Sequence, residues 1–82
     1  MYEIILTHRA IKDLERFDPG TRRRLGQKLQ EYAVDPIPNA RKLVDPTIGT
    51  YRFRIGDYRV IFDLVGTTIV VLRIGHRKEI YR

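Results

Sequence analysis

The chain has 82 residues, with 16 Lys and Arg against 10 Asp and Glu, and a formal net charge of +6. This length predicts one domain, 1–82, with a single modest core, and the charge favours a polyanionic partner, either nucleic acid or an acidic protein. Because cysteine is absent, disulfides, cysteine–zinc sites and thiol catalysis are excluded. No apolar run is long enough to span a membrane and no secretory leader is recognisable, so we expect a cytoplasmic protein without a membrane partner.

The first part of the chain predicts one strand followed by two helices. Residues 2–6 are β-branched and aromatic, as in a strand, and Thr7 can cap the helix that follows. Asp18 and Pro19 suit the N-cap and first position of a second helix. A short joint between the helices predicts an antiparallel hairpin. The expected inner stripes are Ala10, Ile11, Leu14 and Phe17 in the first helix and Leu25, Leu29, Tyr32 and Ala33 in the second.

Residues 35–50 predict a loop with at most a short turn. They contain several prolines and Gly49, and their apolar residues follow neither helical nor strand spacing. Arg41 and Lys42 in this loop add positive charge beside the segment that follows. They are compatible both with a solvated loop and with binding of an anionic ligand.

Residues 51–64 predict a β-hairpin around which the rest of the chain is organised. Gly56 and Asp57 suit a two-residue turn, and counting outward from this turn places Arg54 opposite Arg59. Alternation along the strands then separates an apolar face from a cationic face. The apolar face comprises Tyr51, Phe53, Ile55, Tyr58, Val60, Phe62 and Leu64, and the opposite face comprises Arg52, Arg54, Arg59, Ile61 and Asp63.

The cationic face of this hairpin favours an anionic ligand. Like charges directly opposite each other in a ladder are destabilising by up to about 1 kcal/mol, so folding alone gives no reason to pair Arg54 with Arg59. The planar guanidinium group binds phosphate through two hydrogen bonds at once. The simpler alternative is a solvated sheet face, but several arginines on rigid strands favour a preorganised phosphate site.

A second turn at Gly66 and a third strand follow the hairpin. Residues 69–74 are the most apolar run of the chain, as expected of a central strand. Two registers are open for this strand. A loop of two residues would put Ile69, Val71 and Arg73 on the core face, whereas a loop of three residues would put Val70, Leu72 and Ile74 there. The second register is chemically better because it turns Arg73 toward Arg59.

These elements predict an α+β fold. An N-terminal strand and an antiparallel helix hairpin precede a three-stranded antiparallel meander, with the helices packed on one face of the sheet and an open basic face on the other.

The residues available for chemistry favour metal-free cleavage of RNA by its own 2′-hydroxyl. His8 and His76 lie at opposite ends of the sequence, and no His, Asp and Glu cluster has metal-ligand spacing. Arginine can stabilise charge on the phosphate, but it stays protonated and cannot accept the proton of the hydroxyl. Histidine titrates near neutrality, so His76 is a candidate base, and Tyr81 could transfer a proton with help. Each could instead be a solvated or packed terminal residue.

Two segments closely resemble the toxins of the RelE/ParE superfamily of toxin–antitoxin modules. They are YRFRIGDYRVIF at residues 51–62 and LRIGHRKEIY at residues 72–81, and the likeness extends more weakly over nearly the whole chain. The resemblance implies a small α+β toxin neutralised by a cognate antitoxin. In the RelE branch it implies a protein that enters the ribosomal A site and cleaves mRNA without a metal or cofactor. The family's catalytic positions correspond to Arg52, Arg54, Arg59, Arg77 and Tyr81.

Arg52 and Arg54 occupy two positions at which toxins of the RelE branch often have lysine. A lysine is the usual candidate for the general base in that branch. With arginine at both positions, either His76 is the base or the activity is low. ParE-branch toxins share the fold but bind DNA gyrase and are not nucleases. Two alternatives to the nuclease are therefore a toxin that binds gyrase and a toxin-like protein that has lost activity. Further contacts to RNA are expected from Arg41, Lys42, Arg73 and Lys78.

Overall fold

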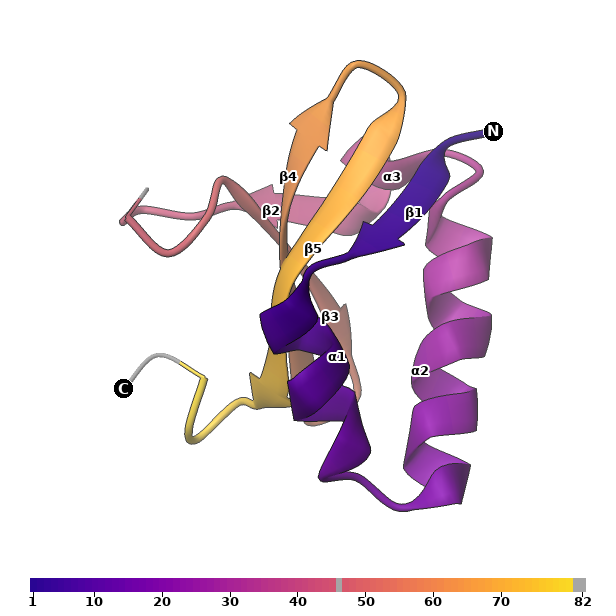
Figure 1. Cartoon of the computed structure of the whole chain (residues 1–82). Helices are drawn as coiled ribbons and strands as arrows, with labels where there is room; N and C mark the ends of the chain where they lie inside the picture. The colour runs from indigo at the N-terminus through magenta and orange to yellow at the C-terminus, as the bar shows by residue number, and fades with distance from the viewer. Residues whose placement is uncertain (46, 81–82) are drawn as a thin grey trace.

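The computed structural model describes residues 1–45 and 47–80. One sheet has the strand order β1-β5-β4-β3-β2, in which β1 runs parallel to β5 and the other neighbours are antiparallel (Figure 1). None of the helices in these residues is long and apolar enough to cross a membrane. The elements are β1 (Glu3–Leu6), α1 (His8–Glu15), α2 (Pro19–Tyr32), α3 (Pro36–Asn39), β2 (Ala40–Lys42), β3 (Tyr51–Ile55), β4 (Tyr58–Val65) and β5 (Thr68–His76).

The two long helices begin at the predicted caps. The Thr7 hydroxyl accepts a hydrogen bond from the Ala10 N–H at 3.1 Å, and the Asp18 carboxylate accepts from the hydroxyl and the N–H of Thr21 at 2.6 and 3.1 Å. The Thr21 hydroxyl, followed by its N–H, lowers the pKa of the Asp18 carboxyl from its ordinary 3.8. One position of the predicted inner stripe is wrong, because Ile11 is exposed.

The helices do not cover the sheet equally. In Figure 1, α2 stands on one side of the sheet, whereas the loop after β2 and the C-terminal segment lie on the other. Helix α1 continues from β1 and borders β5 where β1 has ended. There the Asp13 carboxylate accepts the Ile74 N–H at 2.9 Å and so satisfies a donor at the edge of β5.

The core lies between α2 and the sheet face that the hairpin pattern predicts to be apolar. The rings of Phe53 and Phe62 stack with their centroids 4.2 Å apart, and Tyr32 of α2 packs against Phe53. The observed register of β3 and β4 is the predicted one, with Arg54 opposite Arg59. The buried core comprises Ala10, Leu25, Leu29, Ala33, Phe53, Ile55, Val60, Phe62, Ile69, Val71 and Ile74.

The predicted loop over residues 35–50 contains the short helix α3, in keeping with the short turn expected there, but it also contains a strand that was not predicted. Pro36 begins the short helix α3, where proline is tolerated because the first N–H groups of a helix have no partner within it. Residues 40–42 then pair with β3 as the edge strand β2, which places Arg41 opposite Arg52. A strand of three residues is too short to show alternation in the sequence.

The register of β5 combines both predicted alternatives. Val65 pairs with Thr68, so the turn has two residues and the favoured three-residue loop is wrong. The register shifts between Ile61 and Phe62, which adds Leu72 as an extra residue of a β-bulge. Ile69 and Val71 are therefore buried before the bulge, and Ile74 is buried after it.

The basic face of the sheet is only partly open. Gly49, in the loop between β2 and β3, lies against Ile61 and Leu72, and a Cβ atom there would overlap the Ile61 side chain. The Asp63 carboxylate accepts the Thr50 N–H at 2.8 Å at the end of the same loop. This loop thus closes one side of the face and turns an open surface into a cavity.

Candidate functional site

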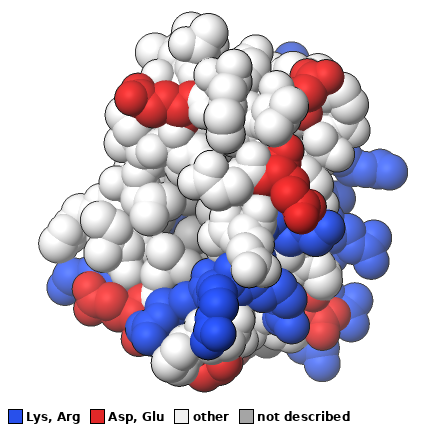
Figure 2. All heavy atoms as spheres, turned by 90° about the vertical axis from the view of Figure 1, so that its right-hand side faces the viewer, with Lys and Arg blue, Asp and Glu red and all other residues white. Residues whose placement is uncertain are grey.

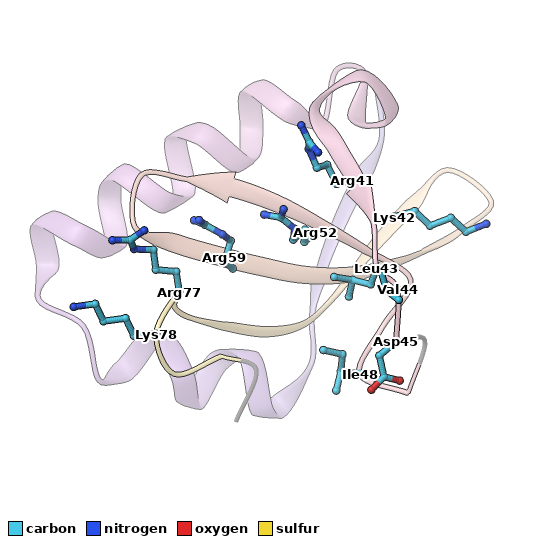
Figure 3. Close-up of a pocket in the computed structure, with 10 residues that line it drawn as sticks. All are labelled: Arg41, Lys42, Leu43, Val44, Asp45, Ile48, Arg52, Arg59, Arg77 and Lys78. Atoms are coloured by element: carbon cyan, nitrogen blue, oxygen red, sulfur yellow. The ribbon is translucent and has the colours of Figure 1, made fainter.

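A cavity of about 860 Å³ lies over β3 and β4 on the face opposite α2 (Figure 3). Arg52 and Arg59 come from these two strands, and the β2–β3 loop and the turn after β5 stand on opposite sides of them. Such a volume is within the usual range for a ligand site. The cavity is lined by Arg41, Lys42, Leu43, Val44, Asp45, Ile48, Arg52, Arg59, Arg77 and Lys78.

Arg59 is held in this cavity by the backbone of its own hairpin. Its Nη1 donates to the carbonyl oxygens of Gly56 and Tyr58, at 3.0 and 2.9 Å, and the residue is only 7% exposed. On β5 its neighbour is Gly75, which has no side chain to compete for this space. The guanidinium group is therefore oriented before any ligand binds.

Arg77 and Lys78 reach the cavity because the chain turns back after β5. The N–H groups of Glu79 and Ile80 both donate to the His76 carbonyl oxygen, at 2.9 and 3.0 Å. Ile80 packs over Gly75, where a Cβ atom would approach its Cδ1 to 2.9 Å. The Arg77 N–H also donates to the Asp57 carbonyl oxygen at 2.7 Å, so the hairpin turn fixes the start of this segment.

The cavity is strongly cationic. Among the described residues that line it, Asp45 is the one acidic residue, against six Lys and Arg. Positive charge is not confined to this site, because Lys and Arg also gather on the lower half of the α2 side (Figure 2). Helix α2 exposes Arg22, Arg23 and Arg24 to solvent. What distinguishes the cavity is a concave arrangement with one arginine buried in it.

The structure brings six of the predicted site residues into this cavity: Arg41, Lys42, Arg52, Arg59, Arg77 and Lys78. Arg54 lies beside it, in a smaller cavity that it shares with Arg41 and Arg52. Arg73 does not turn toward Arg59 as expected. Its Nε donates to the Asp13 carboxylate at 2.9 Å, which holds the guanidinium group against α1 at the edge of the sheet.

His76 is also outside the arginine cavity. His76 on β5 lies opposite Tyr58 on the neighbouring strand β4, and the two rings meet edge to face with their centroids 5.8 Å apart. Its Nδ1 accepts the Lys78 N–H at 3.1 Å, so a neutral imidazole carries its proton on Nε2. The structure therefore does not bring His76, the candidate base, together with the arginines that line the cavity. Tyr81 lies outside the described residues.

Sequence reasoning missed the apolar side of the cavity. Leu43, Val44 and Ile48 line it from the β2–β3 loop. The only signal for them is the presence of aliphatic residues in a segment without periodicity, and that signal does not show which way the side chains point. Among residues 1–45 and 47–80, no three His, Asp or Glu side chains gather closely enough to hold a metal ion.

Residues 4–81 match the family described as the ParE toxin of the type II toxin–antitoxin system parDE. The chain belongs to this family. Within the RelE/ParE superfamily its relatives are of the RelE branch. Toxin RelG of Mycobacterium tuberculosis is 32% identical, over 99% of this chain and 97% of RelG. Toxin RelE3 of Methanocaldococcus jannaschii is 30% identical, over 96% of this chain and 94% of RelE3.

A solved structure shares the fold. It is the RelBE2 toxin–antitoxin complex of Mycobacterium tuberculosis, in which a chain 26% identical to this one superposes with a TM-score of 0.83. The alignment covers 93% of this chain and 98% of that chain. The α+β class predicted from the sequence is therefore confirmed.

Proposed function

We propose that this protein is the toxin of its module and that it cleaves mRNA on the ribosome, so that translation stops. The observation that carries the proposal is the cavity in which Arg52 and Arg59 on the sheet lie beside Arg77 of the C-terminal turn. Guanidinium groups on rigid elements suit the crowded phosphate of an RNA strand. The activity requires ribosomes and message, and hence a cytoplasmic location.

The proposed reaction uses the RNA as its own nucleophile. The 2′-oxygen attacks the adjacent phosphorus and the bond from phosphorus to the 5′-oxygen breaks, which leaves a 2′,3′-cyclic phosphate and a 5′-hydroxyl. One proton leaves the 2′-hydroxyl and one reaches the 5′-oxygen. Arg59 and Arg77 stabilise the negative charge on the phosphate, and Arg52 and Arg41 hold the strand. No cofactor or metal enters these steps.

The proton acceptor is a group other than the arginines of β3. Arg52 and Arg54 stay protonated and cannot accept the proton. His76 packs against Tyr58 and is not among the described residues that line the cavity, so we assign it a structural role. The remaining candidates are Tyr81 and a group of the ribosome.

We infer that a cognate antitoxin neutralises the protein, as the RelBE2 complex of toxin and antitoxin suggests by analogy. A chain with a net charge of +6 and a cationic cavity fits a partly disordered partner with acidic and apolar residues that folds on binding. Such a partner would cover the arginines or displace the segment after β5.

The second candidate is a DNA gyrase poison, and the match to the ParE family is the observation that favours it. Cell-free translation with a parallel supercoiling assay distinguishes the two. Our proposal predicts that translation stops with cleaved message while gyrase is unaffected. Normal translation together with blocked supercoiling would show that the ParE-type function is the correct one.

A further inference from the structure

The cavity has two chemically different sides. The arginines of β3 and β4 and the turn after β5 supply positive charge, whereas Leu43, Val44 and Ile48 present aliphatic side chains from the β2–β3 loop (Figure 3). Val44 is fully exposed, and Ile48 is 36% exposed. Single exposed aliphatic residues are ordinary on a protein surface. Three that line one cavity together with six cations call for a ligand that is anionic in one part and apolar in another.

The loop that carries this apolar side is fixed to the sheet. The Leu43 N–H donates to the Thr50 carbonyl oxygen at 2.8 Å, and this bond closes the base of the loop. The Asp45 carboxylate accepts from the Thr47 hydroxyl and N–H at 2.7 and 3.0 Å, which also lowers the pKa of Asp45. Gly49 packs directly on the sheet face. These contacts hold the backbone near both ends of the loop and so place its aliphatic residues over this face of the sheet.

A nucleotide has the two parts that this cavity requires. Its phosphate is anionic, and an unstacked base presents a flat face that protein side chains cover in single-stranded RNA recognition. We propose that Leu43, Val44 and Ile48 form a nucleobase subsite, against which one base of the RNA packs while the arginines hold the neighbouring phosphates. The inference rests on RNA being the ligand of this cavity, as in the function proposed above.

The subsite contributes affinity without reading the hydrogen-bonding edge of the base. Aliphatic side chains offer no donors or acceptors, so they cover apolar area and exclude water. Phosphate contacts set the salt dependence of binding, whereas contacts to the base do not. The two parts of the cavity can therefore be separated by experiment.

The test compares two short single-stranded RNAs of equal length, one of which carries a stretch of abasic nucleotides. Binding is measured for the native protein, for the double variant Val44→Ser/Ile48→Ser and for Val34→Ser, a control at an exposed valine outside the cavity. Native protein and control should bind the complete RNA about three- to tenfold more tightly than the double variant does. The abasic RNA should bind equally to all three. Loss of stacking within the RNA affects each protein alike, so it cancels in the comparison.

The salt dependence supplies a second readout. The double variant should keep the native slope of log affinity against log salt, whereas Arg52→Gln should lower the affinity for both RNAs and reduce the slope by about 0.7. Circular dichroism should show that each variant is folded. The inference is overturned if the double variant binds the complete RNA as tightly as the native protein does. It is also overturned if the loss is equally large with the abasic RNA, or if the native protein binds neither RNA.

These outcomes are independent of the proposed cleavage. Base-dependent binding without cleavage of ribosome-bound message would keep the subsite and reject the nuclease. Cleavage with no effect of the double variant on base-dependent binding would keep the nuclease and reject the subsite.

Discussion

The Arg59 Nη1 donates to the carbonyl oxygen of Gly56, 3.0 Å away in the turn that joins β3 to β4. Gly56 adopts a positive φ of 59°, which lets the hairpin turn tightly and brings this carbonyl back toward the strand. A guanidinium group fixed in this way does not have to reorganise when charge develops on a phosphate. Replacing Arg59 would also disturb the turn, so Arg77 gives a cleaner test of charge stabilisation.

Replacing Arg77 with alanine should slow cleavage without unfolding the protein. Its side chain is 52% exposed and lies at a long 3.7 Å from the Asp57 carboxylate. Loss of one donor to the charge that develops in a transition state typically lowers the rate by about 10²- to 10³-fold. Single-turnover cleavage of ribosome-bound message measures this effect. Arg23→Ala, which removes an exposed arginine of α2, should stay near the native rate. Equal rates for both variants would contradict the role of Arg77.

Replacing His76 with alanine should leave the cleavage rate within about tenfold of native, below the loss typical of a general base. The imidazole packs on Tyr58 and accepts the Lys78 N–H, so its loss removes a packing contact from the C-terminal turn. Rate profiles between pH 5.5 and 7.5 are the measurement, and they should have the native shape. A flattened profile with a much lower rate would restore His76 as the base.

Asp13→Ala should destabilise the fold more than any change at an exposed charge. The Asp13 carboxylate is nearly buried and accepts from both the Arg73 Nε and the Ile74 N–H, each at 2.9 Å. Its removal leaves both donors without this acceptor and should cost about 2 to 3 kcal/mol of unfolding free energy. Urea denaturation measures the loss. Lys28→Ala breaks the exposed pair with Glu31 and should be indistinguishable from native. An unchanged free energy of unfolding for Asp13→Ala would contradict the role of this carboxylate in attaching α1 to β5.

Two glycine-to-alanine changes should have opposite effects. Gly49 has a φ of +151°, and a Cβ atom there would overlap Ile61, so Gly49→Ala should lower the unfolding free energy by about 2 to 4 kcal/mol. Gly26 lies within α2, and an added Cβ would meet nothing within 4 Å. Gly26→Ala should therefore raise stability by about 0.5 to 1 kcal/mol. Thermal denaturation of the two variants measures these changes in stability. Changes of the same sign would contradict the surroundings described for the two glycines.

The parts of the fold that depend on local chemistry could be predicted from the sequence. Thr7 and Asp18 cap their helices through neighbours three residues away, and Gly56 with Asp57 fixes the hairpin register by counting. The bulge at Leu72 could not be predicted in this way. It depends on how β5 fits between β4 and α1, a relation between segments far apart in the chain.

The candidate site, like the fold, could be predicted where it depends on local pattern but not where it depends on contacts between distant segments. The alternation of β3 and β4 predicts that Arg52 and Arg59 share a face, and the structure agrees. The position of Arg73 could not be predicted, because its partner Asp13 is 60 residues away in sequence and nothing local links the two. The apolar side of the cavity depends on Gly49 packing on the sheet, which is likewise a tertiary contact.

The most direct test of the proposed chemistry is single-turnover cleavage of a ribosome-bound message with one 2′-deoxy nucleotide at the cleaved position. The all-ribose message should be cut to fragments that end in a 2′,3′-cyclic phosphate and begin with a 5′-hydroxyl, and the substituted message should stay intact there. Cleavage of both messages would contradict the use of the 2′-hydroxyl as nucleophile. An intact all-ribose message at saturating ribosome would contradict the nuclease itself.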